Sequence, residues 1–153
     1  MEKKRILFVC LGNICRSPMA EGVFRHKARE MNLEVELDSA GTGGWHIGES
    51  PDGRMQETAK SHGVDISDLR GRQFEVADYD RFDVIYVMDE SNRDNVLKLA
   101  RDDRDRSKVK MMLNEIYPGE DMSVPDPYFG GKQGFEHVYK LLDQAAEKVL
   151  SEL

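Results

Sequence analysis

Short apolar runs of strand length alternate with helical stretches along this chain, and this alternation constrains the fold more than any other feature. Four runs are typical of strands: residues 5–10 (RILFVC), 33–42 (LEVELDSAGT), 81–89 (RFDVIYVMD) and 109–113 (VKMML). Helical spacing of apolar residues occupies residues 17–31, 50–63, 90–100 and 134–153. The alternation predicts an α/β fold, with a parallel sheet and helices on both of its faces.

Local signals add detail to this prediction. Ser17 is a suitable N-cap for the first helix, Glu21 suits the positive end of that helix dipole, and Gly63 is a helix stop signal. The mixed-charge run 101–108 is expected to be a solvated loop. Segment 117–134 is long and rich in Pro and Gly, which is typical of a functional loop or lid.

Composition narrows the class of protein. A chain of 153 residues predicts a single domain over residues 1–153. Its net charge of −7 comes from interspersed acids and bases, which disfavours nucleic acid as a partner.

No apolar run approaches the roughly 20 residues that cross a bilayer. The N-terminal segment also lacks a signal-peptide cleavage site, so we expect a cytoplasmic protein with no membrane partner. Two cysteines are too few for a disulfide framework or a structural zinc site, so no metal is expected.

Both cysteines lie in one short segment, VCLGNICRSP (9–18), between the first strand and the first helix. A loop at the carboxyl end of a parallel strand that opens onto a helix N-terminus favours anions, because unpaired backbone N–H groups converge there. Gly12 and Asn13 tolerate the left-handed backbone that such a loop needs, and Arg16 can offer a bidentate fork to two phosphoryl oxygens. The segment therefore predicts a cradle for a tetrahedral oxyanion.

Cys10 stands where the strand becomes this loop. The amides, the helix dipole and the guanidinium around it favour a thiolate over a thiol and so create a nucleophile. For a lone cysteine, the alternative is a small buried residue that ends a strand. We prefer the catalytic interpretation because the strand, the C-x5-R-S loop and the helix occur together and in the required order.

The segment VCLGNICRSPMAEGVF resembles the signature of the low-molecular-weight protein tyrosine phosphatases. The resemblance continues through DSAGTGGWHIG, VMDESN and VPDPYFGG, in that family's order and at about its spacing. It implies a flavodoxin-like three-layer sandwich with a four-stranded parallel sheet. It also implies a protein-tyrosine-phosphatase without cofactor or metal, which hydrolyses phosphotyrosine in two steps through a phosphocysteine intermediate.

The resemblance also implies roles for individual residues. Cys10 would be the nucleophile and Arg16 the clamp on the phosphoryl group. Ser17 would hydrogen-bond the thiolate, a role compatible with an N-cap. Asp126 would be the general acid and then the general base, with Asp89, at the start of a helix, as a weaker candidate. The phosphate-binding loop would consist of Leu11, Gly12, Asn13, Ile14, Cys15, Arg16 and Ser17.

Four residues concern the support and protection of this loop. Asn13 and Ser39 match residues that hold the loop by hydrogen bonds. Members of the family often carry a histidine in this network where the present chain has Leu69, so we expect a smaller or differently closed network. Cys15 resembles the second cysteine with which many members trap an oxidised nucleophile as a disulfide, and a loop-packing role is the open alternative.

The expected substrates are phosphotyrosine proteins, with phosphate and other oxyanions as inhibitors. The wall positions of the family are occupied by Leu11, Ile14, Trp45, Tyr128 and Phe129. A deep site with aromatic walls grips a phenyl ring and leaves phosphoserine too short to reach the thiolate. A phosphoarginine-specific subgroup typically has threonine at the position of Ile14, and isoleucine offers no hydroxyl to a guanidinium. We expect a monomer or weak dimer, and whether Tyr128 is itself phosphorylated stays open.

Three other functions fit the sequence less well. A thioredoxin-coupled arsenate reductase shares the loop but needs later cysteines, and none follows Cys15. A module that binds phosphotyrosine or another oxyanion without turnover would not need both Cys10 and Asp126. A structural protein gives no reason for combining these two residues with Arg16.

Overall fold

The computed structural model describes residues 3–127 and 131–153, which form a four-stranded parallel sheet. Its strands are β1 (Lys4–Cys10), β2 (Val35–Gly41), β3 (Val84–Val87) and β4 (Val109–Met111), in the order β2-β1-β3-β4. Cys10 of β1 pairs with Gly41 of β2, so both strands end at the same edge of the sheet. This strand order is that of a flavodoxin-like sheet and confirms the predicted fold class.

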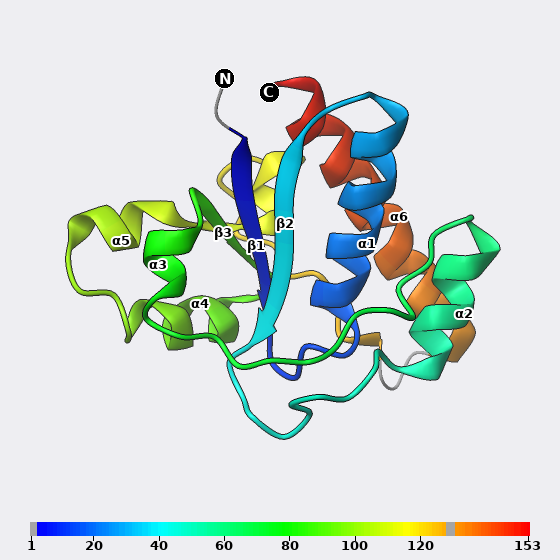
Figure 1. Cartoon of the computed structure of the whole chain (residues 1–153), viewed down its shortest axis with the longest axis horizontal. Coiled ribbons are helices and arrows are strands. Elements are labelled where there is room, and N and C mark those ends of the chain that lie inside the picture. The colour runs from blue at the N-terminus through cyan, green and yellow to red at the C-terminus, as the bar shows by residue number, and fades with distance from the viewer. Residues whose placement is uncertain (1–2, 128–130) are drawn as a thin grey trace.

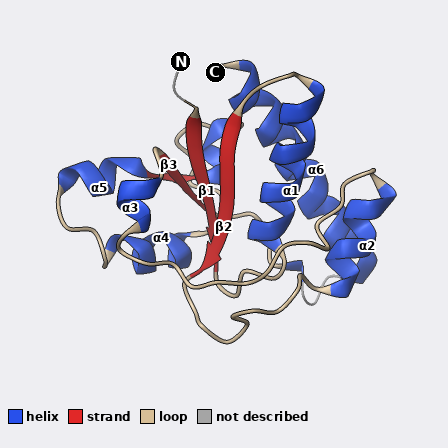
Figure 2. Ribbon diagram, in the orientation of Figure 1, coloured by secondary structure: helices blue, strands red, loops and turns tan. Residues whose placement is uncertain are grey.

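Helices cover both faces of the sheet (Figures 1 and 2). One face carries α1 (Arg16–Glu30), α2 (Gly53–Ser61) and α6 (Gly131–Ser151), and the other carries α3 (Asp78–Arg81), α4 (Glu90–Leu97) and α5 (Asp103–Lys108). A short 3-10 helix, η1 (Met112–Glu115), follows β4. The described residues thus form the expected three-layer sandwich. None of the described helices is both long and apolar enough to cross a membrane.

Alternate residues of β1 supply the two hydrophobic cores, because successive side chains of a strand point to opposite faces. Ile6 and Phe8 pack into the core beneath α1 and α6, where the rings of Phe8 and Phe24 lie 4.6 Å apart. Leu7 and Val9 pack into the core beneath α3 and α4. Burial on both faces holds β1, and with it the position of Cys10, rigidly in place.

Two local predictions were wrong. Segment 101–108 is not a solvated loop, because α5 forms within it and buries Asp105. The Asp105 carboxylate accepts a hydrogen bond from Arg101 Nε at 2.8 Å. The two residues form an i,i+4 ion pair within this run of charged residues. Ser17 is not the N-cap of α1. The helix begins at Arg16 with Cys15 in the cap position, and Ser17 lies inside the first turn.

Candidate active site

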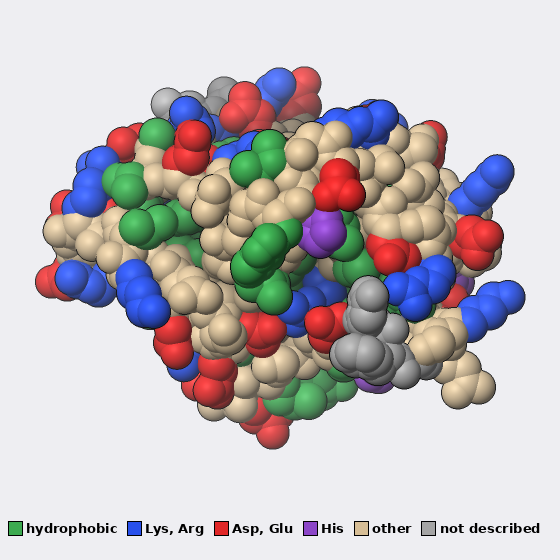
Figure 3. Space-filling model, turned by 90° about the horizontal axis from the view of Figure 1, so that it is seen from below, with side chains coloured by type: hydrophobic (Ala, Val, Ile, Leu, Met, Phe, Trp, Pro, Cys, Tyr) green, Lys and Arg blue, Asp and Glu red, His purple; other side chains and the backbone are tan. Residues whose placement is uncertain are grey.

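The segment that joins β1 to α1 lies at the carboxyl edge of the sheet, the face that Figure 3 shows from below. The segment that follows β2, residues 42–52, holds this β1–α1 loop in place through backbone hydrogen bonds. Thr42 N donates to the Cys10 carbonyl at 2.9 Å, and Asp52 N donates to the Ile14 carbonyl at 2.8 Å. The loop passes so close to Gly41 that a Cβ there would lie 2.8 Å from the carbonyl oxygen of Leu11, so only glycine fits.

The backbone N–H groups from Leu11 to Ser17 form an uninterrupted row of unused donors. Within the described part of the chain, none of them donates a hydrogen bond to the protein. The last of them belong to the first turn of α1, whose dipole adds partial positive charge. A curled loop of this kind can bind a tetrahedral oxyanion.

Asn13 holds the loop in this shape. Its φ angle of 57° puts its backbone in the left-handed region, as expected. The side-chain Nδ2 donates to Ser17 Oγ at 2.8 Å and to Ser39 Oγ at 3.0 Å, while Oδ1 accepts from Arg72 N at 3.0 Å. One buried amide thus ties the loop to α1, β2 and the segment before α3.

In this loop only Asn13 has a positive φ, so the tolerance of Gly12 for a left-handed backbone is not used. The small size of Gly12 matters in another way. A Cβ at Gly12 would lie 3.0 Å from Cδ2 of His46, so the glycine lets the imidazole approach the loop. Motif reasoning did not single out His46, whose Nδ1 lies 2.5 Å from Glu49 Oε2.

Cys10 and Ser17 are brought together at the centre of the loop. Cys10 is buried, and its Sγ lies 3.0 Å from Ser17 Oγ. Because Ser17 Oγ already accepts from Asn13 Nδ2, the hydroxyl hydrogen is available to the sulfur. The Ser17 hydroxyl can therefore donate to Cys10 Sγ, which is nearer than its other possible acceptor, the Ala40 carbonyl at 3.5 Å.

Glu21 closes the hydrogen-bond network that supports the loop. Ser39 Oγ donates to Glu21 Oε1 at 2.7 Å, and burial of this carboxyl group raises its pKa to about 7. Glu21 lies beyond the first turn of α1, so it does not occupy the positive end of the helix dipole as expected, and its side chain is buried in the network. Leu69 packs against the hydrophobic core instead of joining the network. The network is thus closed differently, by a carboxylate on α1.

Arg16 is buried and held from one side. Its Nη1 donates to Asp89 Oδ2 and to the Val124 carbonyl, both at 2.9 Å. These bonds leave the Nε–Nη2 edge of the guanidinium without a partner among the described residues, so this edge can serve as the fork for an oxyanion. Asp89 also caps α4, since its Oδ1 accepts from Asn92 N at 2.7 Å. Sequence reasoning found the cap of α4 and missed the ion pair with Arg16.

A hollow of about 190 Å³ gathers most of the predicted site residues. Its lining includes Cys10, Leu11, Ile14, Arg16, Trp45, His46 and Asp126. Asp126 is exposed, and Val124, two residues before it, is anchored by its N–H to the Met88 carbonyl at 2.7 Å. In Figure 3, basic side chains are recessed near the middle of this face, among hydrophobic, acidic and histidine side chains. Tyr128 and Phe129 lie outside the described residues.

Cys15 lines the same hollow, and both cysteines are free thiols. Burial, together with the charge of Asp52, raises the pKa of Cys15 to about 12. Cys15 is therefore a thiol at neutral pH, and its environment does not prepare it for nucleophilic attack.

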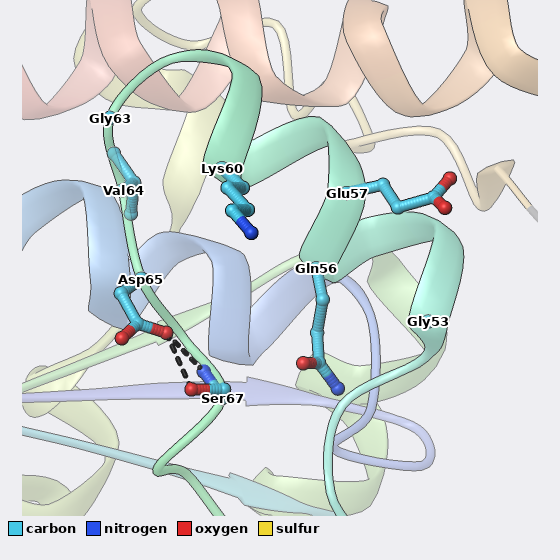
Figure 4. A pocket seen from close by; sticks show the side chains of 8 residues that line it. All are labelled: Gly53, Gln56, Glu57, Lys60, Gly63, Val64, Asp65 and Ser67. Carbon is cyan, nitrogen blue, oxygen red and sulfur yellow. Dashed lines mark hydrogen bonds between the residues drawn. The ribbon is translucent and has the colours of Figure 1, made fainter.

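A larger hollow of about 560 Å³ lies between α2 and segment 63–67 (Figure 4). Lys60 and Asp65 contribute opposite charges to its lining, and no thiol lines it. Among the described residues, no group of three or more His, Cys, Asp or Glu side chains is placed to hold a metal ion.

Comparisons with known proteins agree with this geometry. The family model for low molecular weight phosphotyrosine protein phosphatase matches residues 5–153. A low molecular weight protein-tyrosine-phosphatase of Streptomyces coelicolor is 41% identical over 151 residues, which cover 96% of this chain and 92% of that protein.

Two solved structures are similar over almost the whole chain. A protein tyrosine phosphatase of Entamoeba histolytica, with Hepes in its active site, has a TM-score of 0.91 at 36% identity, covering 98% of this chain and 96% of that one. A drosophila arginine phosphatase has a TM-score of 0.88 at 34% identity, with 96% of both chains covered. The chain belongs to the family of low molecular weight phosphotyrosine protein phosphatases and is, as expected, an enzyme of that family.

Proposed function

We propose that this enzyme hydrolyses phosphotyrosine in proteins through a phosphocysteine intermediate on Cys10. The observation that carries the proposal is the 3.0 Å contact between Cys10 Sγ and Ser17 Oγ inside the row of unused backbone donors. A sulfur placed there faces every group that would hold a phosphoryl group.

In the first step, the Cys10 thiolate attacks phosphorus and the bond to the tyrosine oxygen breaks. Asp126, which lines the same hollow, gives its proton to the leaving oxygen. The free edge of Arg16 and the loop amides stabilise the charge on the three transferred oxygens. The products are tyrosine, phosphocysteine and the Asp126 carboxylate.

In the second step, Asp126 takes a proton from water as the water attacks phosphorus. The S–P bond breaks, inorganic phosphate leaves, and the thiolate returns to the hydroxyl of Ser17. Asp126 is again protonated, so the cycle needs no metal or cofactor.

Phosphoarginine is the second candidate substrate, because a structural neighbour is an arginine phosphatase. The lining favours a phenyl ring instead. Ile14 and Leu11 present only hydrocarbon to the hollow, and Trp45 adds an aromatic surface. A guanidinium would find no hydroxyl at Ile14.

Cys15 lines the same hollow as Cys10, and a local rearrangement of the loop that brings its thiol out of this environment would let it act as the partner for an oxidised nucleophile. A Cys15→Ser variant tests this role. We expect it to lose more activity irreversibly than the wild type after exposure to peroxide followed by reduction, and equal recovery would contradict the role.

The function is tested by phosphate release from matched phosphotyrosine, phosphoserine and phosphoarginine peptides, without added metal and with Cys10→Ser as the blank. We expect fast release from phosphotyrosine alone, and none with Cys10→Ser. Preference for phosphoarginine would refute the argument from Ile14. Oxyanion binding without release from any peptide would favour a module that only binds.

A further inference from the structure

We infer that a second subsite, next to the phosphate site, binds an acidic residue that flanks phosphotyrosine in the substrate; this inference rests on the proposed function. The subsite is a hollow of about 290 Å³ on the far side of Leu11 and Trp45. These two residues also line the hollow that contains Cys10, so the two hollows share one wall. The Lys98 side chain would pair with the acidic residue.

One peptide can occupy both hollows, because the same two side chains line them. An extended chain advances about 3.3 Å per residue, so a residue one or two positions from phosphotyrosine can reach across a wall made of single side chains. The peptide would then lie over Trp45, which is 71% exposed.

The rim of the subsite is unusually apolar for a protein surface. Leu11 and Leu99 are 46% and 42% exposed, and with Trp45 they surround one hollow. Figure 3 shows hydrophobic side chains gathered on this face. Clustered exposed apolar groups beside a binding site are typical of a surface that contacts a ligand, and they suit the methylene groups of an acidic side chain and the neighbouring peptide.

Lys98 supplies the charge. It is exposed, at the C-cap of α4, where its backbone N–H donates to the Asp94 carbonyl at 3.1 Å. Its ammonium group forms no ion pair or hydrogen bond within the described ranges 3–127 and 131–153. Arg93, one turn earlier on the same helix, instead lies within ion-pair distance of Asp94 and Asp121. A cation without a partner on the rim of a largely apolar hollow fits a carboxylate from outside.

A polar group in the lining also lacks a partner. The Thr42 hydroxyl oxygen is buried and makes no hydrogen bond in the described part of the chain. Thr42 lines the subsite, next to the amide side chains of Gln73 and Asn95. The amide side chains of Gln73 and Asn95, unlike the buried Thr42 hydroxyl, can meet the backbone of a bound peptide.

The alternative is that Lys98 serves only to stabilise α4, through the favourable interaction of its positive charge with the negative C-terminal end of the helix dipole. That role affects stability and has no bearing on the choice of substrate. The two ideas are therefore separated by substrate preference.

The test uses phosphotyrosine peptides that differ only by Glu, Ala or Lys at the flanking positions, with kcat/KM as the readout. We expect the wild type to prefer the Glu peptide over the Lys peptide by about fivefold at low salt, which corresponds to the free energy of one exposed ion pair. Lys98→Glu should reverse this preference. Lys140→Glu, the same charge change on an exposed residue of α6, should leave it unchanged.

An aryl phosphate without flanking residues completes the test. Wild type and Lys98→Glu should hydrolyse it equally, because the phosphate site is untouched. If the aryl phosphate is hydrolysed and the three peptides are not distinguished, the subsite is refuted and the phosphatase stands. An equal loss for all peptides with Lys98→Glu would also refute it. If the aryl phosphate is not hydrolysed at all, the proposed function fails instead.

Discussion

Asn13→Ala tests most sharply how the loop is held in shape. The substitution removes three hydrogen bonds, two of them buried, to Ser17 and Ser39, and one partly buried, from Arg72 N. At about 1 kcal/mol each they contribute about 3 kcal/mol. Alanine also tolerates a φ of 57° less well than asparagine, which adds about 1 kcal/mol. We therefore expect the free energy of unfolding to fall by about 4 kcal/mol, a large effect for a single substitution.

Urea unfolding measures this change, and two variants separate its causes. Asn13→Gly removes the same hydrogen bonds and relieves the backbone, so it should cost less than Asn13→Ala. Asn32 has an almost identical φ of 56° but is exposed, and its side chain makes no hydrogen bond to any residue that the structure describes. Asn32→Ala should therefore cost about 1 kcal/mol or less. Equal destabilisation by Asn13→Ala and Asn32→Ala would refute the assignment of the loop's support to the Asn13 amide.

Further predictions concern the acids around the loop. The pKa of Glu21 is raised from 4.5 to about 7 in the folded protein, so the native state binds more protons than the unfolded state between these values. Wild type should therefore lose about 2–3 kcal/mol of stability relative to Glu21→Gln as the pH rises from 4.5 to 8, and parallel urea-unfolding curves across that range would contradict this. Asp126→Asn should lower phosphotyrosine hydrolysis by roughly 10² to 10⁴, and much less for esters whose leaving group needs no proton; a uniform loss would count against the acid role. Asp89→Asn keeps a good cap for α4 but removes the charge facing Arg16, so kcat/KM should fall about tenfold with little change in stability, and an unchanged kcat/KM would show that Arg16 needs no such partner.

The layers of the fold were predictable from the sequence because the spacing of its apolar residues indicates which side of each element is buried. The five buried residues Ile6–Cys10 and the apolar stripe of α6 identify a central strand and a docked helix without any knowledge of their partners. Segment 101–108 failed because a run of alternating charges contains no such stripe. Its helix depends on a cap at Asp102 and on the Arg101–Asp105 pair.

The candidate site was predictable where its residues lie in one motif. Cys10 and Ser17, which are in contact, are only seven positions apart, and the left-handed Asn13 lies between them. Across long separations, only the partners that the resemblance named, Ser39 and Asp126, were predictable, and the other long-range contacts were not. Glu21 meets Ser39 across 18 positions, and Arg16 meets Asp89 across 73. Only the folded sheet brings these partners to one edge.

The central claim is that Cys10 carries the phosphoryl group, and trapping that group tests the claim most directly. A ³²P-labelled phosphotyrosine peptide is mixed with enzyme for a single turnover and quenched in alkaline denaturant, and the labelled fragment is then identified by mass spectrometry. We predict label on Cys10 in the wild type, longer-lived label when Asp126 is replaced by Asn, and no label with Cys10→Ser. Rapid phosphate release without label on Cys10, or label on another residue, would contradict the mechanism.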